Sequence, residues 1–336
     1  MIEEAVRDVR DGHSLGRERA RDAMREIMGG GAEQAEITAF LAALMAKGET
    51  AEEITGFADA MREHVVPVTP TRELVIDVVG TGGDGAGTFN ISTTAALVAA
   101  AAGAAVAKHG NRAASSACGA ADVLEELGFE LEQPPERIAE SIDRFGFGFM
   151  FARAHHPAMR HAAPSRQELG TRTVFNILGP LSNPAGARDG VFGVYSPDLA
   201  LTYAETLAGL GARRAFVVHG DGGLDELSPT GLNLVVEVAD GEIREWELDP
   251  RSLGVYPADP ASLRGGSAEE NAATLRAVLD GERSGRRDAV LLNAGAALVA
   301  AGIADDLGEG FAIAAEAIDS GAAATRLDDL REFSHG

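Results

Sequence analysis

The chain has 336 residues, which allows two domains or one large α/β domain, and 45% of them are hydrophobic, so a sizeable core is expected. Its net charge of −23 argues against nucleic acid as a partner, because phosphate binding needs clustered lysine and arginine. A single cysteine, Cys118, excludes a disulfide within the chain and suits a reducing cytoplasm. The start lacks the apolar core of a signal peptide, and the longest apolar run, residues 95–107, is too short for a bilayer. We therefore expect a cytoplasmic protein that does not act at a membrane.

Helical patterns fill the first part of the chain. One helix is predicted from apolar residues spaced as on a buried helix face: Ile37, Phe40, Leu41, Leu44 and Met45. A second begins with a capping box of Thr50 and Glu53 and continues with the apolar stripe Ile54, Phe57 and Met61. The proline-containing stretch 65–71 then breaks the pattern. We expect a small helical domain over residues 1–68.

Strands and helices alternate after this boundary. Strands are predicted at residues 73–80, 104–110 and 214–220, helices at 90–103, 119–128 and 199–211, and a β-hairpin at 233–249. The C-terminal part looks mostly helical. Such alternation favours a central sheet with helices on its faces, so the predicted fold class is α/β, with residues 72–336 forming the larger domain.

A glycine-rich segment, GTGGDGAGTFN at residues 80–90, follows the first predicted strand. It contains the G-x-G-x-x-G spacing of dinucleotide-binding turns in Gly80, Gly82 and Gly85. Two features argue against such a site: the next helix starts only near residue 90, and the following strand ends in Lys108 and His109, where a dinucleotide site needs an acid. The lysine of a P-loop is also missing.

The same turn and the polar helix start NIST predict an anion site made of backbone N–H groups. The alternative is that Asn90 or Ser92 is only a helix cap. A second loop should emerge beside the first at the same sheet edge, and it supplies Lys108, Arg112, Ser115 and Ser116. Together the two loops would suit a ligand with two separate phosphate groups.

Two adjacent acids stand in the segment GLDELSPTG, residues 223–231. Asp225 and Glu226 follow a predicted strand and a glycine turn. Paired carboxylates suit Mg²⁺, which normally keeps several waters and also binds substrate phosphates. The alternative is a solvated acidic turn, which is common in a chain with 52 acidic residues.

The motifs GTGGD, NIST, KHGNRAASS, FNILGPLSNPA and GLDELSPTG occur together in an order and spacing that resemble the anthranilate phosphoribosyltransferases over nearly the whole chain. The resemblance implies that the amine of anthranilate displaces diphosphate from C1 of 5-phosphoribosyl 1-diphosphate (PRPP), giving N-(5-phosphoribosyl)anthranilate for tryptophan biosynthesis. It also implies two Mg²⁺ ions per monomer and an active site at a hinge. The helical domain would be completed by a mid-chain segment near 163–185 and would form a homodimer.

The resemblance also implies roles for residues at matching positions. Contacts to PRPP would come from Gly80, Gly83, Asp84, Thr88, Asn90, Ile91, Ser92, Thr93, Lys108, His109, Gly110, Asn111, Arg112, Ala113, Ala114, Ser115, Ser116 and, through backbone alone, Ala120. One Mg²⁺ would be held by Ser92 and Glu226, the other by Asp225 and Glu226. Arg166 would clamp the anthranilate carboxylate, since arginine suits planar, bidentate recognition. The anthranilate pocket would further include Gly80, Asn111, His109 and His156.

Several alternatives stay open at this point. His109 and His156 could equally be hydrogen-bonded structural histidines, and no general base stands out. A pyrimidine nucleoside phosphorylase of the same fold would bind a neutral base and have little use for Arg166 or for two carboxylate metal ligands. A non-catalytic nucleic-acid-binding relative would need a basic face.

Overall fold

A seven-stranded mixed sheet forms the centre of this computed structural model, which describes residues 1–113 and 117–336. Its strands are β1 (Ile76–Gly80), β2 (Val106–Gly110), β3 (Phe147–Phe151), β4 (Asp189–Gly193), β5 (Arg214–His219), β6 (Asn233–Ala239) and β7 (Glu242–Leu248). They lie in the order β3-β2-β1-β4-β5-β6-β7, with the first five parallel and the last two added antiparallel. Three predicted site residues lie outside the described residues: Ala114, Ser115 and Ser116.

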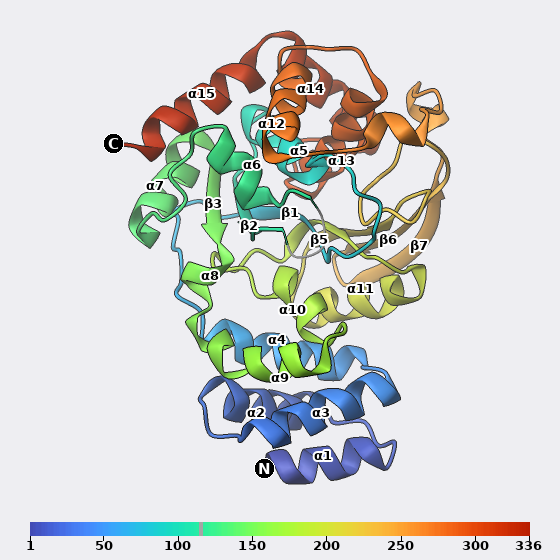
Figure 1. The fold of residues 1–336 in the computed structure, drawn as a ribbon. Helices are drawn as coiled ribbons and strands as arrows, with labels where there is room; N and C mark the ends of the chain where they lie inside the picture. Colours follow the sequence, from blue (N-terminus) through green and yellow to red (C-terminus); the bar gives the residue numbers. More distant parts are fainter. Residues whose placement is uncertain (114–116) are drawn as a thin grey trace.

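Helices cover both faces of the sheet, as Figure 1 shows. The upper layer in that view contains α5 (Ile91–Ala101), α6 (Ala120–Glu126), α12 (Ala268–Leu279), α13 (Gly285–Ala300), α14 (Leu307–Asp319) and α15 (Ala322–Ser334). Below the sheet lie α10 (Phe175–Leu181) and α11 (Ala200–Gly209), while α7 (Pro135–Phe145) packs on β3. Nine of the eleven residues of α5 are buried, because this helix lies between the sheet and α13. The predicted α/β class is therefore confirmed.

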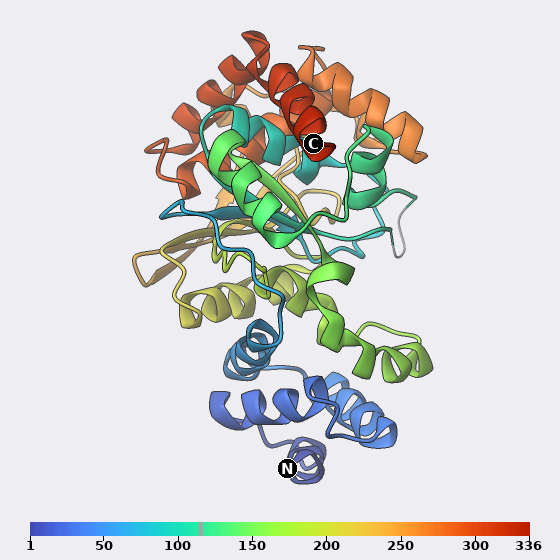
Figure 2. The same ribbon diagram turned by 90° about the vertical axis from the view of Figure 1, so that its left-hand side faces the viewer.

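A helical bundle at the N-terminus extends away from the sheet. It consists of α1 (Ile2–Arg10), α2 (Arg17–Met28), α3 (Gln34–Lys47) and α4 (Ala51–Glu63). A mid-chain segment joins it, as Figure 2 shows: α8 (Ala152–His155) leads down from β3, and α9 (Ala163–Leu169) packs on α3. Ser165 Oγ donates to the Gln34 carbonyl at 3.1 Å, and Arg62 Nε to the Leu181 carbonyl at 2.7 Å. Apolar side chains of the bundle, α10, α11 and the lower sheet face form one continuous cluster.

Four short 3-10 helices complete the part of the chain that the structure describes, and each begins with a proline, whose fixed φ suits a first helical position. They are η1 (Pro157–His161), η2 (Pro197–Leu199), η3 (Pro250–Leu253) and η4 (Pro260–Leu263). Within the described residues we find no helix that combines the length and the apolar character needed to cross a membrane.

Most local patterns predicted the elements correctly. The capping box is confirmed, because the Thr50 hydroxyl accepts the Glu53 N–H at 3.3 Å and the Glu53 carboxylate accepts the Thr50 N–H at 2.9 Å. The prediction of a buried apolar stripe on α3 is wrong for its last residue, since Met45 is 38% exposed. Strands β3 and β4 were not predicted, because their sequences FGFMF and DGVFG show neither alternation nor an uninterrupted branched run.

One buried carboxylate ties the bundle together. Glu53 is fully buried, and its Oε1 accepts the Leu15 N–H at 2.9 Å from the loop between α1 and α2. Its Oε2 accepts Lys47 Nζ at 2.8 Å as well as the Thr50 N–H. A buried charge of this kind is stable only while its partners remain.

We expect Glu53→Ala to lower the free energy of unfolding by about 3–5 kcal/mol, because it leaves the Leu15 N–H without its acceptor and the half-buried Lys47 ammonium without its carboxylate partner. The control is Glu52→Ala, at the exposed neighbouring position, which should change it by no more than about 0.5 kcal/mol. Urea unfolding of both variants measures this, and equal unfolding free energies would contradict the structural role of Glu53.

Candidate active site

The candidate site lies where the parallel strands end. Chain order reverses between β1 and β4: from β1 the chain continues to β2 and β3 on one side, and β4 leads to β5 on the other. In open α/β sheets, ligands bind at such a switch point outside the carboxyl ends of the strands. Gly80 and Gly193, the last residues of β1 and β4, are paired there.

Most predicted PRPP contacts lie at this edge in three stretches. These are the end of β1 and its loop (Gly80, Gly83, Asp84 and Thr88), the start of α5 (Asn90, Ile91, Ser92 and Thr93), and the end of β2 with the loop to α6 (Lys108, His109, Gly110, Asn111, Arg112, Ala113 and Ala120). The loop after β5 brings Asp225 and Glu226 to the same place.

Close approach of Asp225 explains the glycines at the two strand ends. Its Oδ2 accepts the Gly82 N–H at 2.6 Å. A Cβ on Gly80 would lie 2.1 Å from that Oδ2, and a Cβ on Gly193 would lie 1.5 Å from the Asp225 carbonyl oxygen. A side chain at either position would therefore displace the acidic turn.

The glycine loop itself presents unpaired backbone donors. Gly82, Gly83, Gly85 and Gly87 all have positive φ, between 62° and 76°, a conformation that side chains disfavour. Within the described part of the chain, no group accepts the N–H of Gly83, Asp84, Gly85 or Gly87. Successive N–H groups free to converge on one ligand form an anion-binding turn.

The start of α5 is tied to two distant segments. Asn90 occupies the cap position, but its side chain makes no capping bond; its Oδ1 accepts Asn271 Nδ2 at 2.9 Å, and its Nδ2 donates to the Cys118 carbonyl at 3.3 Å. Ser92 lies inside the helix, and its N–H donates to Glu226 Oε1 at 2.8 Å. The simple capping alternative is therefore wrong for both residues.

A buried cation and two half-buried acidic residues meet beside this helix. Lys108 is 2% exposed, and its Nζ donates to the Val78 carbonyl at 2.7 Å and lies 3.5 Å from Ser92 Oγ. Burial lowers the pKa of Lys108, opposed by the carboxylates around it. Burial, with repulsion from Asp84, raises the pKa of Asp225 to about 6; burial and repulsion from Asp225 raise the pKa of Glu226 strongly.

This donor set fits Mg²⁺. Asp225 and Glu226 offer carboxylate oxygens, and their raised pKa values mean that a cation would relieve the unfavourable burial of two neighbouring negative charges. Over residues 1–113 and 117–336, no three or more His, Cys, Asp or Glu side chains form a ready-made metal cluster. A site of one or two carboxylates completed by substrate phosphate is the kind that Mg²⁺ usually occupies.

Two histidines form a neutral buried pair. His109 and His156 are 5% and 8% exposed, with their Nε2 atoms 3.2 Å apart. His109 Nδ1 lies 3.0 Å from the Gly179 carbonyl and must donate to it, so His109 Nε2 is the acceptor of the His156 Nε2–H. Burial, with repulsion between the rings, lowers the pKa of His109 to about 3, and burial lowers that of His156 to about 4.

Arg166 on α9 has a guanidinium without a hydrogen-bonding or charged partner among the described residues. Its guanidinium carbon lies 5.6 Å from the centre of the Phe175 ring, and within the described residues the guanidinium has neither a hydrogen bond nor an ion pair. Burial lowers the pKa of Arg166. Glu168, the obvious surface partner, instead accepts hydrogen bonds from Gln34 and Thr38 at 3.2 and 3.0 Å. Phe175 and Gly179 lie one turn apart on α10, so Arg166 and His109 contact neighbouring positions of one helix.

Asp122 binds backbone groups on both sides of residues 114–116, and the sequence did not indicate this role. Asp122 Oδ2 accepts the N–H groups of Ala113 and Gly119, both at 2.9 Å. Arg112, predicted to bind PRPP, donates to Asp122 at 3.1 Å and to Glu125 at 2.7 Å. Its guanidinium is therefore engaged on α6 in this structure. The available signal was a glycine at the cap position followed by an acid in the first helical turn, a combination favoured at helix starts.

A C-terminal segment also covers the glycine loop and was not predicted. The Phe89 N–H donates to the Leu263 carbonyl at 3.0 Å, and the Gly265 N–H to the Gly87 carbonyl at 2.9 Å. Asn271 adds the contact to Asn90. No local pattern in these residues indicates that they reach the first strand's loop.

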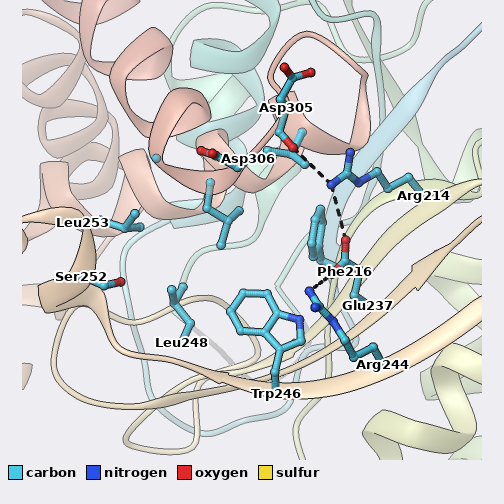
Figure 3. Close-up of a pocket in the computed structure, with 13 residues that line it drawn as sticks. Arg214, Phe216, Glu237, Arg244, Trp246, Leu248, Ser252, Leu253, Asp305 and Asp306 are labelled. Atoms are coloured by element: carbon cyan, nitrogen blue, oxygen red, sulfur yellow. Dashed lines mark hydrogen bonds and ion pairs between the residues drawn. The ribbon is translucent and has the colours of Figure 1, made fainter.

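A cavity of about 470 Å³ lies elsewhere, at the start of β5 (Figure 3). Trp246 forms part of its apolar wall, and Glu237 accepts from Arg214 at 3.5 Å and from Arg244 at 3.0 Å. These arginines are thus already paired, and the cavity faces away from the carboxyl ends of β1 and β2. We therefore do not place the substrates there.

Known proteins match this chain over nearly its whole length. Residues 72–324 match the α/β domain of a glycosyl transferase family, and residues 3–65 match its helical bundle domain. The anthranilate phosphoribosyltransferase of Methanocorpusculum labreanum is 50% identical over 337 residues, covering 100% of this chain and 99% of that protein. The chain belongs to the anthranilate phosphoribosyltransferase family. The resemblance inferred from the motifs is thereby confirmed.

Solved structures of anthranilate phosphoribosyltransferases share the whole fold. That of Thermus thermophilus has a TM-score of 0.94 and 50% identity, covering 99% of each chain. The Saccharomyces cerevisiae enzyme in complex with PRPP and Mg has a TM-score of 0.90 and 29% identity, covering 99% of this chain and 98% of that one. The same yeast enzyme with 4-fluoroanthranilate has a TM-score of 0.88 and 27% identity, covering 99% and 97%.

The neutral histidine pair predicts a loss of stability in acid. An unfolded histidine has a pKa of about 6.5, well above the folded values of about 3 and 4, so the unfolded state binds more protons between these limits. Stability should therefore fall as the pH falls below about 6.5. His156→Gln keeps a donor for His109 but removes one of the two buried titrating groups. Between pH 7.5 and 4.5, the free energy of unfolding of this variant should therefore fall by about 2 kcal/mol less than that of the unsubstituted protein.

Urea unfolding at several pH values measures this difference, with His13→Gln at an exposed position as the control. The control should follow the unsubstituted protein. A pH dependence of His156→Gln identical to that of His13→Gln would show that the pair does not titrate as described.

Proposed function

We propose that this protein transfers the 5-phosphoribosyl group of PRPP to the amine of anthranilate and releases diphosphate, at the edge where β1, β2 and β5 end. The observation that carries the proposal is the contact of the acidic turn with both anion-binding elements. Asp225 accepts the Gly82 N–H of the glycine loop, and Glu226 accepts the Ser92 N–H of α5. These contacts support the proposal, because they bring two carboxylates that would hold the metal beside the groups that would bind phosphate.

The leaving diphosphate gains negative charge while C1 of the ribose becomes cation-like. Free N–H groups of the glycine loop and the buried Lys108 ammonium are fixed donors, so they stabilise this charge without reorganising. Bound Mg²⁺ would supply Lewis-acid neutralisation of the diphosphate. We propose two ions, one held by Ser92 and Glu226 and one by Asp225 and Glu226, in keeping with the Mg and PRPP of the yeast complex.

The attacking amine needs little proton transfer beforehand. Both ring nitrogens of His109 are engaged within the protein, and His109 and His156 are neutral at pH 7 and resist protonation. An arylamine loses its proton readily once attack has begun. We therefore assign no general base, and the two histidines fix α10 against β2 on the anthranilate side of the site.

The anthranilate carboxylate would bind Arg166. Its guanidinium is half-buried and has no partner among the described residues, which leaves its donors free for a planar carboxylate. Phe175 behind it offers an aromatic face. Gly80 and Asn111 would complete the pocket near the amine, as the resemblance implies.

We also propose that the two parts of the chain have different roles. The helical unit, residues 1–68 with the segment 163–185, would form a homodimer, and residues 72–336 would bind PRPP. Met1 and Met45 of the bundle are 63% and 38% exposed, which supports a further contact on this unit. The single cysteine and the lack of a membrane-crossing helix in the described residues support a place in the cytoplasm.

The direct test mixes purified protein with PRPP, Mg²⁺ and anthranilate, and follows the loss of anthranilate fluorescence. Anthranilate should be consumed only when PRPP and Mg²⁺ are both present. A protein that binds PRPP but leaves anthranilate unchanged would overturn the proposal.

Substitution of the acidic pair tests the metal site. Asp225→Asn with Glu226→Gln keeps the shape but removes both charges, so activity should fall by at least about 100-fold and half-saturation by Mg²⁺ should move to higher concentration. The fold should survive, because burial already opposes ionisation of both carboxyls. Glu242→Gln with Glu245→Gln, an exposed pair on β7, is the charge-matched control. An unchanged Mg²⁺ titration curve would exclude the assignment.

Removal of Arg166 tests the carboxylate clamp. A hydrogen bond to a charged group contributes about 1.5–3 kcal/mol, so Arg166→Ala should lower kcat/KM for anthranilate by about 10- to 150-fold. The loss should lie mainly in the KM for anthranilate, since the carboxylate is bound in ground and transition states alike. Arg160→Ala, at an exposed position of η1, should leave both KM values unchanged. A normal anthranilate KM in folded Arg166→Ala would refute the role.

A further inference from the structure

Arg172 connects the mid-chain helical segment to the glycine loop. It lies between α9 and α10, and its Nη2 donates to the carbonyl oxygen of Gly83. The planar group also lies over the Tyr195 ring, with its central carbon 4.2 Å from the ring centre. A Cβ on Gly83 would come within 2.9 Å of Nη2 and would push the guanidinium aside, and the φ of +76° at this position also disfavours a side chain.

Tyr195 is itself fixed to the start of the same loop. Its N–H donates to Thr81 Oγ1 at 3.2 Å, and the Thr81 N–H donates to the Gly193 carbonyl at 2.9 Å. Arg172 therefore touches the glycine loop directly at Gly83 and indirectly, through Tyr195, at Thr81. The guanidinium is the group that joins these contacts to the segment carrying Arg166.

The contact at Gly83 controls the direction of the next amide. A trans peptide is planar, so its C=O and N–H point in opposite directions. When Arg172 holds the Gly83 carbonyl, the Asp84 N–H must point away from the guanidinium. No acceptor for this N–H exists in the described residues, and the neighbouring N–H groups of Gly83 and Gly85 are free as well.

We propose that Arg172 is a positioning residue that aims the Asp84 N–H at a phosphate of PRPP. The inference rests on the proposed function. Gly83 has a φ of +76° and no side chain that could fix the peptide bond between Gly83 and Asp84. The orientation of this peptide therefore depends on a donor from outside the loop. Arginine suits this task because its planar group can stack on Tyr195 and donate sideways at the same time.

The opposite role would be a latch that holds the loop shut against PRPP. The two roles differ in the sign of one measurement. If Arg172 orients the loop for PRPP, its removal weakens PRPP binding. If it blocks the loop, its removal strengthens PRPP binding.

The test uses Arg172→Met, which keeps the length of the side chain but no donor, and Arg172→Lys, which keeps the charge without the planar group. Arg160→Met, at an exposed position, is the matched control. Amide hydrogen exchange of peptides covering residues 80–88 is measured in the free protein, and PRPP affinity in Mg²⁺ by calorimetry. Anthranilate turnover is then followed with each substrate varied separately.

For Arg172→Met we expect exchange in residues 80–88 to be about 5- to 10-fold faster and the Kd for PRPP to be about 10-fold higher, which is the effect of losing one hydrogen bond from a charged donor. The KM for anthranilate should change less than twofold, and Arg172→Lys should recover part of the PRPP affinity. Unchanged exchange, or tighter PRPP binding, would overturn the proposal. Failure of the unsubstituted protein to consume anthranilate while it binds PRPP would instead contradict the proposed function.

Discussion

The approach of Asp225 to the ends of β1 and β4 is the constraint on which the rest of the site depends. Glycines at 80 and 193 leave room for it, and its bond to the Gly82 N–H fixes the first half of the glycine loop. The same turn carries Glu226 to the start of α5. Partial burial of two adjacent carboxylates is unfavourable by itself, because burial and repulsion from neighbouring carboxylates raise the pKa of both. Backbone donors and the Lys108 ammonium offset part of this cost, and a divalent cation would offset more.

The two sides of the site differ in charge. Carboxylates lie on the side of β1 and β5, whereas the segment between β3 and α10 brings Arg166, Arg172 and His156, whose neutral ring pairs with that of His109 on β2. The whole protein carries a net charge of −23, so its long-range field repels an anionic substrate. Local N–H groups, two buried or half-buried cations and the metal must therefore supply the attraction. This makes the orientation of each donor more important than the overall charge.

Much of this arrangement could be predicted from short patterns. Glycine after an apolar strand, polar residues at a helix start and paired acids after a strand each have a local physical meaning, and the structure brings GTGGD, NIST and DE together at one edge. Their joint order identified the family, because several weak motifs in fixed sequence are specific together. Strands β3 and β4 escaped prediction, since short buried strands containing glycine show no period that separates them from other apolar runs.

The sequence by itself determined the fold class, the anion-binding character of the glycine loop and the residue types available for a metal and a carboxylate. The tertiary structure alone decided which side chains are free to act. Arg112 is paired on α6, both nitrogens of His109 are engaged, and Arg166 has no partner among the described residues. It also decided that Arg172 reaches Gly83. These pairings depend on distances between segments that are far apart in the chain. Spacing along the sequence does not give such distances, because the sheet sets the positions of the loops that carry these residues.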